Sequence, residues 1–564
     1  MPAFLSAPRR EIAGILALTL AGAIVRAWNF PRLGLGHFDE GIYALSGLWI
    51  LQPTGLASID PKLIPYAPPG FTVLVGLAYF MLGISDLAAI SVSLVLGTLT
   101  IPAVGWLARR AFGPGAGVAA AALAAFCGPH VAFSRIALTD AGFLLAWLLA
   151  LGLGSRFLER PGLGRGILLG VAVGIAQNFK YHGWLAGLIV VATGVSLLFG
   201  RPRRDAGKRL AWMALPPVFG ALVYLPWYQF VEQQSGGYAG LLAHHRTYMG
   251  GLALWLPHLR LQLAQAVALS GGPLWGIAAW SLGWVGLNLV AKDSDGLSKL
   301  AKSHFATMLI AGATLLAFLP NLSWWLGLAG CAWLIRDTRP TVRLLAIWWI
   351  ISAILSPLYH PYARLWLPIE AAGWIVLAGL MVDLRARAFL EDREGVRGHR
   401  VTWIEPREQV AIALLMLGIC HDLGLPPRAR PLPDCLAPTD GIRNAVKELA
   451  AADPPMPRLF VMARPPVAFY LSTTTRVAFS VIGSWSDLEA APGGAEWALV
   501  DEALLRQEPD RERIRERISD RWVVERSFPA TLNNPTLLDI NPGAAFDRVV
   551  DRQAPLTLYR PRSR

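Results

Sequence analysis

The sequence has 564 residues, of which 54% are hydrophobic and only 16% are charged, and its mean hydropathy is +0.45. This balance excludes an ordinary soluble globular protein. The net charge of +13 does not indicate nucleic-acid binding, because the basic residues are divided among many short loops rather than gathered on one domain.

Apolar runs of about 17 to 25 residues recur through residues 1–423, and each is long enough to cross a hydrocarbon core of about 30 Å. Residues 424–564, in contrast, have the composition of a small soluble domain. We therefore predict an all-α polytopic membrane domain over residues 1–423 and an α/β domain over residues 424–564. The runs predict about thirteen spans, at about residues 11–28, 85–108, 115–133, 141–157, 165–179, 183–200, 210–230, 273–291, 304–319, 321–335, 342–357, 366–383 and 409–423.

Lysine and arginine are concentrated in alternate loops, such as those with Arg9/Arg10, Arg109/Arg110 and residues 201–209. Basic loops of this kind are typical of the cytoplasmic side of a membrane. The pattern predicts a multi-pass protein of the cytoplasmic membrane whose N-terminus is inside. With an odd number of spans, the loop that holds Asp39 and the C-terminal domain both lie on the extracytoplasmic side.

The first outer loop, residues 29–84, is too long for a simple turn. Residues 38–51 and 69–83 are apolar, too short to span comfortably, and predict two helices that lie in the membrane interface. Asp39 and Glu40 then stand at the N-terminus of the first helix, at the depth of lipid headgroups. The structural alternative is that Asp39 is only a helix cap.

The same side of the membrane carries further polar residues. Taken alone, each has an ordinary explanation as a helix cap, a turn residue or an interfacial anchor. Together, acids and cations on one face suit a reaction at a phosphate-bearing lipid headgroup, because an acid can act as general base and cations can stabilise a leaving phosphate. These further residues are Asp140, Lys180, Arg246, His360, Tyr362 and Arg364.

A lipid or solute transporter, or a flippase, is the alternative function. A coupled transporter is expected to carry ionisable residues near the middle of its spans and internal inverted repeats. Ionisable residues are nearly absent from the predicted spans, and no repeat is evident, so the pattern favours an enzyme.

Several stretches, in this order, resemble the polytopic GT-C glycosyltransferases, and most closely the protein O-mannosyltransferase and aminoarabinose lipid A transferase group. The resemblance covers about residues 10 to 385. It rests on HFDEGIYA, YAPPGFTVLVGLAYFMLG, SRIALTD, NFKYHG and HPYARLWLP.

This resemblance implies an enzyme that moves a sugar from a polyprenyl-phosphate donor to an acceptor hydroxyl outside the cytoplasmic membrane, with inversion. Asp39 would be the general base, Glu40 would position it, and Asp140 would match the second acid of the family. Many relatives carry a lysine just before the Pro-Pro of the second interfacial helix, whereas this chain has Ala67 there. The candidates for binding the donor phosphate are therefore Lys62, Lys180, Arg246, His360, Tyr362 and Arg364.

In the C-terminal domain, we expect a helix over 439–452, strands over 458–463, near 476–481, over 497–501 and over 521–528, and a charged helix over 508–519. The domain lacks a glycine-rich phosphate loop. It also lacks the Trp-Trp-Asp motif typical of oligosaccharyltransferases, which argues against that related activity. No set of metal ligands stands out, so metal dependence is left open, and a lipid, glycan or protein acceptor are all compatible with the sequence.

Overall fold

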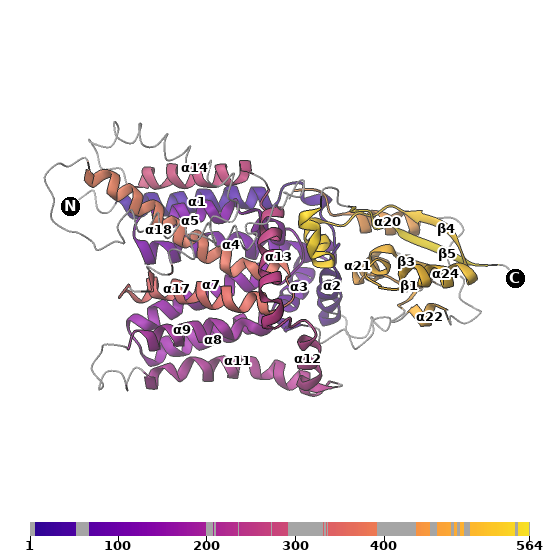
Figure 1. The fold of residues 1–564 in the computed structure, drawn as a ribbon, viewed down its shortest axis with the longest axis horizontal. Coiled ribbons are helices and arrows are strands. Elements are labelled where there is room, and N and C mark those ends of the chain that lie inside the picture. Colours follow the sequence, from indigo (N-terminus) through magenta and orange to yellow (C-terminus); the bar gives the residue numbers. More distant parts are fainter. Residues whose placement is uncertain are drawn as a thin grey trace.

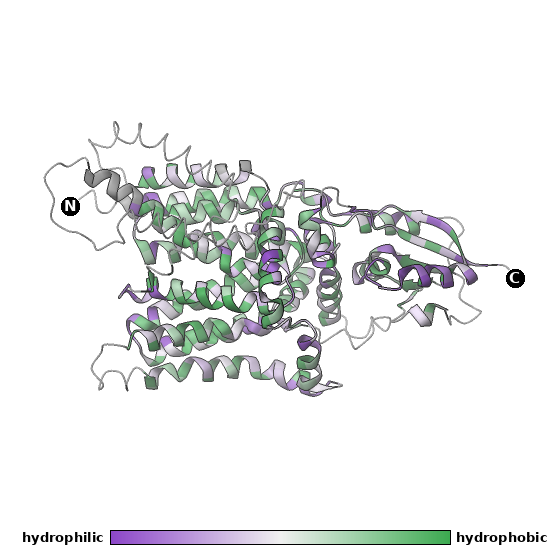
Figure 2. Cartoon of the chain, in the orientation of Figure 1, coloured by the Kyte–Doolittle hydropathy of each residue, from purple (hydrophilic) through white to green (hydrophobic). Residues whose placement is uncertain are grey.

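The computed structural model describes residues 6–51, 67–198, 207, 210–234, 236–271, 273–290, 331, 334–335, 337–391, 436–451, 459–474, 479–481, 485–489, 497–547 and 551–562. Two parts lie end to end, a bundle of long helices and a smaller part that contains a sheet (Figure 1). Hydrophobic residues line the bundle helices along their length (Figure 2).

The bundle is built from helices that run side by side, with shorter helices at the end next to the C-terminal part (Figure 1). Exposed apolar side chains such as Leu20 and Phe80, 64% and 78% exposed, suit contact with lipid. The helices are α1 (Ser6–Arg26), α2 (Phe38–Leu51), α3 (Pro69–Leu82), α4 (Asp86–Phe112), α5 (Ala116–Ala125), α6 (Gly128–Ser134), α7 (Asp140–Glu159), α8 (Leu163–Phe179), α9 (Leu185–Ser196), α11 (Leu215–Glu232), α12 (Gly237–Arg246), α13 (Trp255–Ala268), α14 (Pro273–Val290), α17 (Pro340–Leu355) and α18 (Leu367–Glu391).

Five helices in the described part of the chain are long and apolar enough to cross a membrane, and a bent pair makes up to six. The predicted membrane protein is confirmed in this coarser form, but the expected thirteen spans are not. The predicted spans 304–319 and 409–423, and most of 321–335, fall outside the described residues.

Over the span expected at 115–133 the structure has a bent pair of helices instead of one continuous helix, because α5 and α6 meet there at an angle of 61°. Pro129 stands in the first turn of α6, where its missing N–H does no harm but a continuous helix would be broken. The guanidinium of Arg26 donates to the carbonyls of Ala124 and Ala125, at 3.2 and 3.0 Å, and so satisfies groups that the break leaves open.

The helices α2 and α3 match the two short helices expected in the first outer loop. Nine residues of α2 are buried, because α2 packs against α3 on one side and α21 (Pro465–Thr474) of the C-terminal part on another. Gly41 makes this approach feasible, since a Cβ atom there would lie 2.2 Å from the backbone nitrogen of Pro466. The acidic N-terminus of α2 is thus enclosed between the two parts of the molecule.

The C-terminal part is a five-stranded mixed sheet in the order β2-β1-β3-β5-β4, which confirms the small α/β fold. β1 is parallel to β2 and β3, while β5 is antiparallel to β3 and β4. β5 and the short helix α25 have no counterpart in the sequence prediction. The elements are α20 (Gly441–Ala450), β1 (Leu459–Met462), α21, β2 (Phe479–Val481), α22 (Trp485–Glu489), β3 (Trp497–Asp501), α23 (Glu502–Leu505), α24 (Arg511–Arg521), β4 (Trp522–Phe528), α25 (Asn534–Ile540) and β5 (Leu556–Pro561).

Candidate active site

Asp39 lies in the first turn of α2 and pairs with Arg364 of the short 3₁₀ helix η7 (Ala363–Trp366). Nη1 of Arg364 is 2.5 Å from Oδ2 of Asp39, and the two side chains are 12% and 8% exposed. A guanidinium at this distance stabilises the ionised carboxylate. The carboxylate of Asp39 is therefore oriented by a cation from a distant loop.

Glu40 is fully buried and is committed to the backbone. Its Oε2 accepts the N–H groups of Gly36 and His37, and its Oε1 accepts that of Ala137, each at 2.7 Å. Burial raises the pKa of Glu40, although these three amides oppose the rise. Glu40 thus ties the segment before α2 to the segment before α7.

Asp140 and Lys180 form the second ion pair, with 2.5 Å between Oδ1 and Nζ. The hydroxyl of Thr139 donates to the carbonyl of Phe179 at 3.0 Å and fixes the two loops that carry them. Burial lowers the pKa of Lys180, partly opposed by Asp140, and the charges of Arg364 and Asp39 also act on it. The two ion pairs are therefore one electrostatic cluster.

Tyr362 and His360 border this cluster. The guanidinium of Arg364 lies 4.7 Å from the centroid of the Tyr362 ring, a cation–π contact, and the His360 ring is 4.4 Å from that ring. Burial lowers the pKa of His360, so the imidazole is mainly neutral near pH 7.

The other two candidate cations are not brought to the cluster. Arg246 ends α12, is exposed, and has no side-chain hydrogen bond or ion pair with any residue that the structure describes. Lys62 lies outside the described residues.

Two residues that the sequence did not single out complete the cluster. His37 accepts the backbone N–H of Asp39 on Nδ1 at 3.0 Å, and its Nε2 lies 2.8 Å from Oδ2 of Asp539. Asp539 belongs to α25 of the C-terminal part, and its Oδ2 is also 3.4 Å from Nε of Arg364. His37 stands two positions before Asp39 and could have been noticed, whereas nothing in the sequence around Asp539 points to a site.

An apolar cavity of about 340 Å³ adjoins the cluster between α2, α3, α8 and α11. Tyr43 connects the two, because it lines the cavity while the charges of Asp39, Arg364 and Asp140 act on its hydroxyl group.

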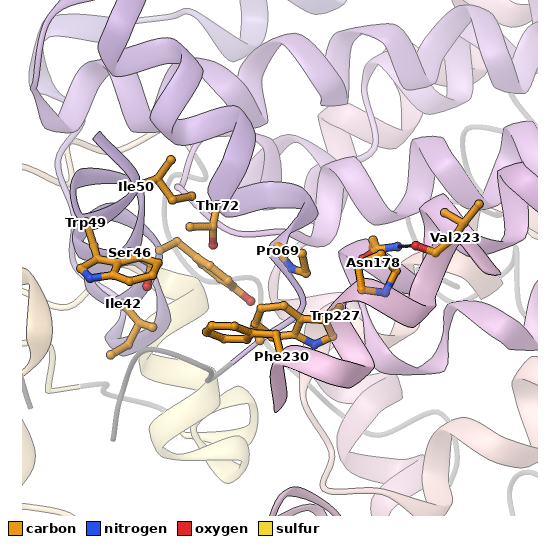
Figure 3. Close-up of a pocket in the computed structure, with 13 residues that line it drawn as sticks. Ile42, Ser46, Trp49, Ile50, Pro69, Thr72, Asn178, Val223, Trp227 and Phe230 are labelled. Atoms are coloured by element: carbon orange, nitrogen blue, oxygen red, sulfur yellow. Dashed lines mark hydrogen bonds between the residues drawn. The ribbon is translucent and has the colours of Figure 1, made fainter. Parts of the chain in front are cut away.

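Figure 3 shows Trp227 and Phe230 on one side of the cavity, with Trp49 and Ile42 on the other. Asn178 closes part of the wall through a bond from its side-chain amide to the carbonyl of Val223, at 3.4 Å. Ala67 also lines the cavity.

No group of three or more His, Cys, Asp or Glu side chains suited to a metal ion occurs within the described part of the chain. The acids of the cluster are instead neutralised by Arg364 and Lys180.

The sequence of residues 66–228 matches the family model described as dolichyl-phosphate-mannose-protein mannosyltransferase. A search of curated protein sequences found no match.

Solved structures match most of the chain. ArnT from Cupriavidus metallidurans, bound to undecaprenyl phosphate, is 15% identical, with a TM-score of 0.51 over 97% of each chain. The archaeal oligosaccharyltransferase AglB from Archaeoglobus fulgidus, in complex with an inhibitory peptide and a dolichol-phosphate, is 14% identical, with a TM-score of 0.49 over 88% of this chain and 69% of that one. The family match and the ArnT fold confirm the resemblance to the polytopic GT-C glycosyltransferases.

Proposed function

We propose that the protein is an inverting glycosyltransferase that moves a sugar from a polyprenyl-phosphate donor to an acceptor hydroxyl on the extracytoplasmic side of the membrane. The observation that carries this proposal is the pairing of Asp39 with Arg364 and of Asp140 with Lys180 in one buried cluster beside an apolar cavity. Such a place offers a base, cations for a phosphate, and room for a lipid.

In the proposed reaction, Asp39 takes the proton of the acceptor hydroxyl as its oxygen attacks the anomeric carbon. The bond between that carbon and the phosphate oxygen breaks on the opposite face, and the phosphate leaves with the electron pair. Attack from the face opposite the leaving group inverts the configuration. Asp140 keeps the ammonium of Lys180 in place beside this reaction.

Lys180 and Arg364 are the cations that we propose to stabilise the departing phosphate. A guanidinium has five N–H donors, so Arg364 can contact Asp39, Asp539 and a phosphate at the same time. The phenol of Tyr362 is a further donor on the same side. Arg246 would take part only after a rearrangement of α12.

The cavity is the place that we propose for the first isoprene units of the donor. Its wall is aromatic and aliphatic, as expected of a site for an apolar chain. Tyr43 would mark the boundary between the lipid and the phosphate, since it faces both the cavity and the charged cluster.

The test is sugar transfer by the full-length protein in liposomes, with radiolabelled polyprenyl-phosphate sugars and crude envelope acceptors. We expect one donor to be consumed, and Asp39→Asn to slow its consumption by about 10²- to 10⁴-fold. Asp520→Asn, an exposed acid on α24, is the matched control and should transfer at the wild-type rate.

If Asp39→Asn transfers sugar as fast as the wild type does, Asp39 is not the base. If no donor is consumed by the wild type while labelled lipid crosses the bilayer, the protein is a flippase and the transferase proposal fails.

A further inference from the structure

Asp539 comes from the C-terminal part of the chain, yet it lies in the cluster that surrounds Asp39. It stands near the end of α25, whose N-cap, Asn533, accepts the N–H of Thr536 at 2.8 Å. Leu538 of the same helix is fully buried, so α25 is anchored in the core. The Asp539 side chain is only 5% exposed. Its carboxylate is therefore fixed within the boundary between the two parts.

Asp539 contacts the two residues that hold Asp39. Its Oδ2 lies 2.8 Å from Nε2 of His37 and 3.4 Å from Nε of Arg364. His37 in turn accepts the backbone N–H of Asp39, and Arg364 contacts the Asp39 carboxylate. One oxygen of Asp539 thus restrains Asp39 through both its main chain and its side chain.

The hydrogen bonds also define the form of the His37 ring. Because Nδ1 accepts an amide N–H, it carries no proton, and the ring proton is on Nε2, from which it is donated to Asp539. A proton added to Nδ1 would break the bond to the Asp39 amide.

We propose that Asp539 is a positioning residue of the transferase site, through which the seated C-terminal part aligns Asp39 for catalysis; this inference rests on the proposed function. It predicts that transfer requires the carboxylate of Asp539 as well as the residues of the membrane part.

The competing explanation is that Asp539 only holds the two parts together. Other contacts already do so: Arg464 donates to the carbonyl of Gly36 at 2.7 Å, Tyr470 donates to Asp86 at 2.7 Å, and the N–H of Leu35 donates to Tyr470 at 2.8 Å. None of these three contacts involves His37 or Arg364. Moreover, Oδ1 of Asp539 is buried and has no hydrogen-bond partner among the described residues. A buried oxygen without a partner lowers stability, so it is unfavourable in a residue whose only role is to hold the two parts together.

The experiment compares Asp539→Asn, Asp539→Glu and Tyr470→Phe in the full-length protein, by transfer kinetics and thermal unfolding. We expect Asp539→Asn to lower kcat by about 10- to 100-fold with little change in the KM of either substrate, because misplacement of the base affects the chemical step. Asp539→Glu should recover part of kcat. Tyr470→Phe removes two hydrogen bonds between the two parts and should change the unfolding temperature but not kcat.

The pH profile separates positioning from stability. The charged groups that act on the His37 ring are Asp39, Glu40, Asp539 and Arg364. Burial lowers the pKa of His37, but Asp539 and Asp39 together raise it above its ordinary value. Removal of the Asp539 charge should therefore move the acid limb of kcat to lower pH, and Tyr470→Phe should leave it in place.

A double-mutant cycle covers the case in which a single variant folds poorly. If Asp539 acts through His37, the loss in kcat for His37→Gln with Asp539→Asn should be close to the larger of the two single losses. If the wild type transfers sugar and Asp539→Asn has the same kcat and the same pH profile, the role of Asp539 is wrong while the proposed function stands. If the wild type transfers no sugar, both the inference and the proposed function are wrong.

Discussion

Arg364 and Asp39 are 325 positions apart in the sequence, yet Nη1 of the arginine lies 2.5 Å from Oδ2 of the aspartate. Both side chains are largely buried, so little water screens the pair. This relationship joins the first outer loop to a loop near the end of the membrane part, and it places the charge of Arg364 directly beside the proposed base.

Replacement of Arg364 by alanine should leave Asp39 and Asp539 buried without their shared cation. We expect kcat to fall by about 10²-fold or more, and the free energy of unfolding to fall by about 3–5 kcal/mol. Arg364→Lys should restore only part of both, because an ammonium lacks the fork that contacts two carboxylates.

Transfer kinetics in liposomes and thermal unfolding in detergent measure these effects. Arg560→Gln, which removes an exposed guanidinium on β5, serves as the control. Equal kcat values for Arg364→Ala and Arg560→Gln would contradict the role given to Arg364.

The affinity for the donor should weaken at alkaline pH because of Lys180. Burial lowers the pKa of Lys180 below its ordinary value of 10.5, so the ammonium loses its proton earlier than an exposed lysine does as the pH rises. We expect the KM for the donor to rise on the alkaline side, while Lys180→Arg keeps its charge and removes this rise. The measurement is the KM for the donor over a series of pH values, for the wild type and for Lys180→Arg. If the KM of both proteins rises in the same way on the alkaline side, Lys180 does not bind the phosphate.

Glu40 should matter for stability more than for chemistry. Glu40→Gln replaces one carboxylate oxygen by an amide that faces a backbone N–H, and each unsatisfied group is expected to lower the free energy of unfolding by about 1–3 kcal/mol. The unfolding temperature should therefore drop, and the transfer rate per folded molecule should change less than it does in Asp39→Asn. If the unfolding temperature stays the same while kcat collapses, Glu40 takes part in the reaction directly.

The cavity should determine how the length of the donor lipid affects binding. Ser46 lines the cavity and is half-buried, so Ser46→Trp should fill space that we assign to isoprene units. We expect the KM for a long-chain donor to rise about tenfold or more, in keeping with lost apolar burial, and the KM for a short-chain analogue to rise much less. Ser519→Trp on the exposed face of α24 is the control. An equal effect of Ser46→Trp on both donors would place the lipid elsewhere.

The sequence was sufficient to predict the short helices of the first outer loop and most of the C-terminal strands. In both cases the signal is local: the acidic start and apolar spacing of residues 38–51, and short apolar segments such as 497–501 between polar turns. The break between α5 and α6 was missed because residues 115–133 are apolar except for His130, so their composition resembles a continuous span. Only Pro129 marked the break.

The pairing of the cluster could not be predicted in the same way. Asp39, Asp140, Lys180 and Arg364 were identified as a group on one side of the membrane, but which acid pairs with which cation depends on the packing of distant loops. Asp539 was missed altogether, since a single aspartate in a short helix carries no pattern, and only the docking of the C-terminal part brings it to Arg364.

The order of the strands has a consequence for how the protein is made. β5 pairs with both β3 and β4. The segment before β5 also binds the segment before α25: the N–H of Leu532 donates to the carbonyl of Arg552, and the N–H of Ala554 donates to the carbonyl of Ala530, each at 2.8 Å. During translation, the sheet therefore cannot close, and the segment before α25 lacks these two backbone bonds, until residues 551–561 have left the ribosome. The membrane helices emerge long before that point, so we expect a nascent chain interrupted before residue 551 to be inserted in the bilayer without a closed sheet.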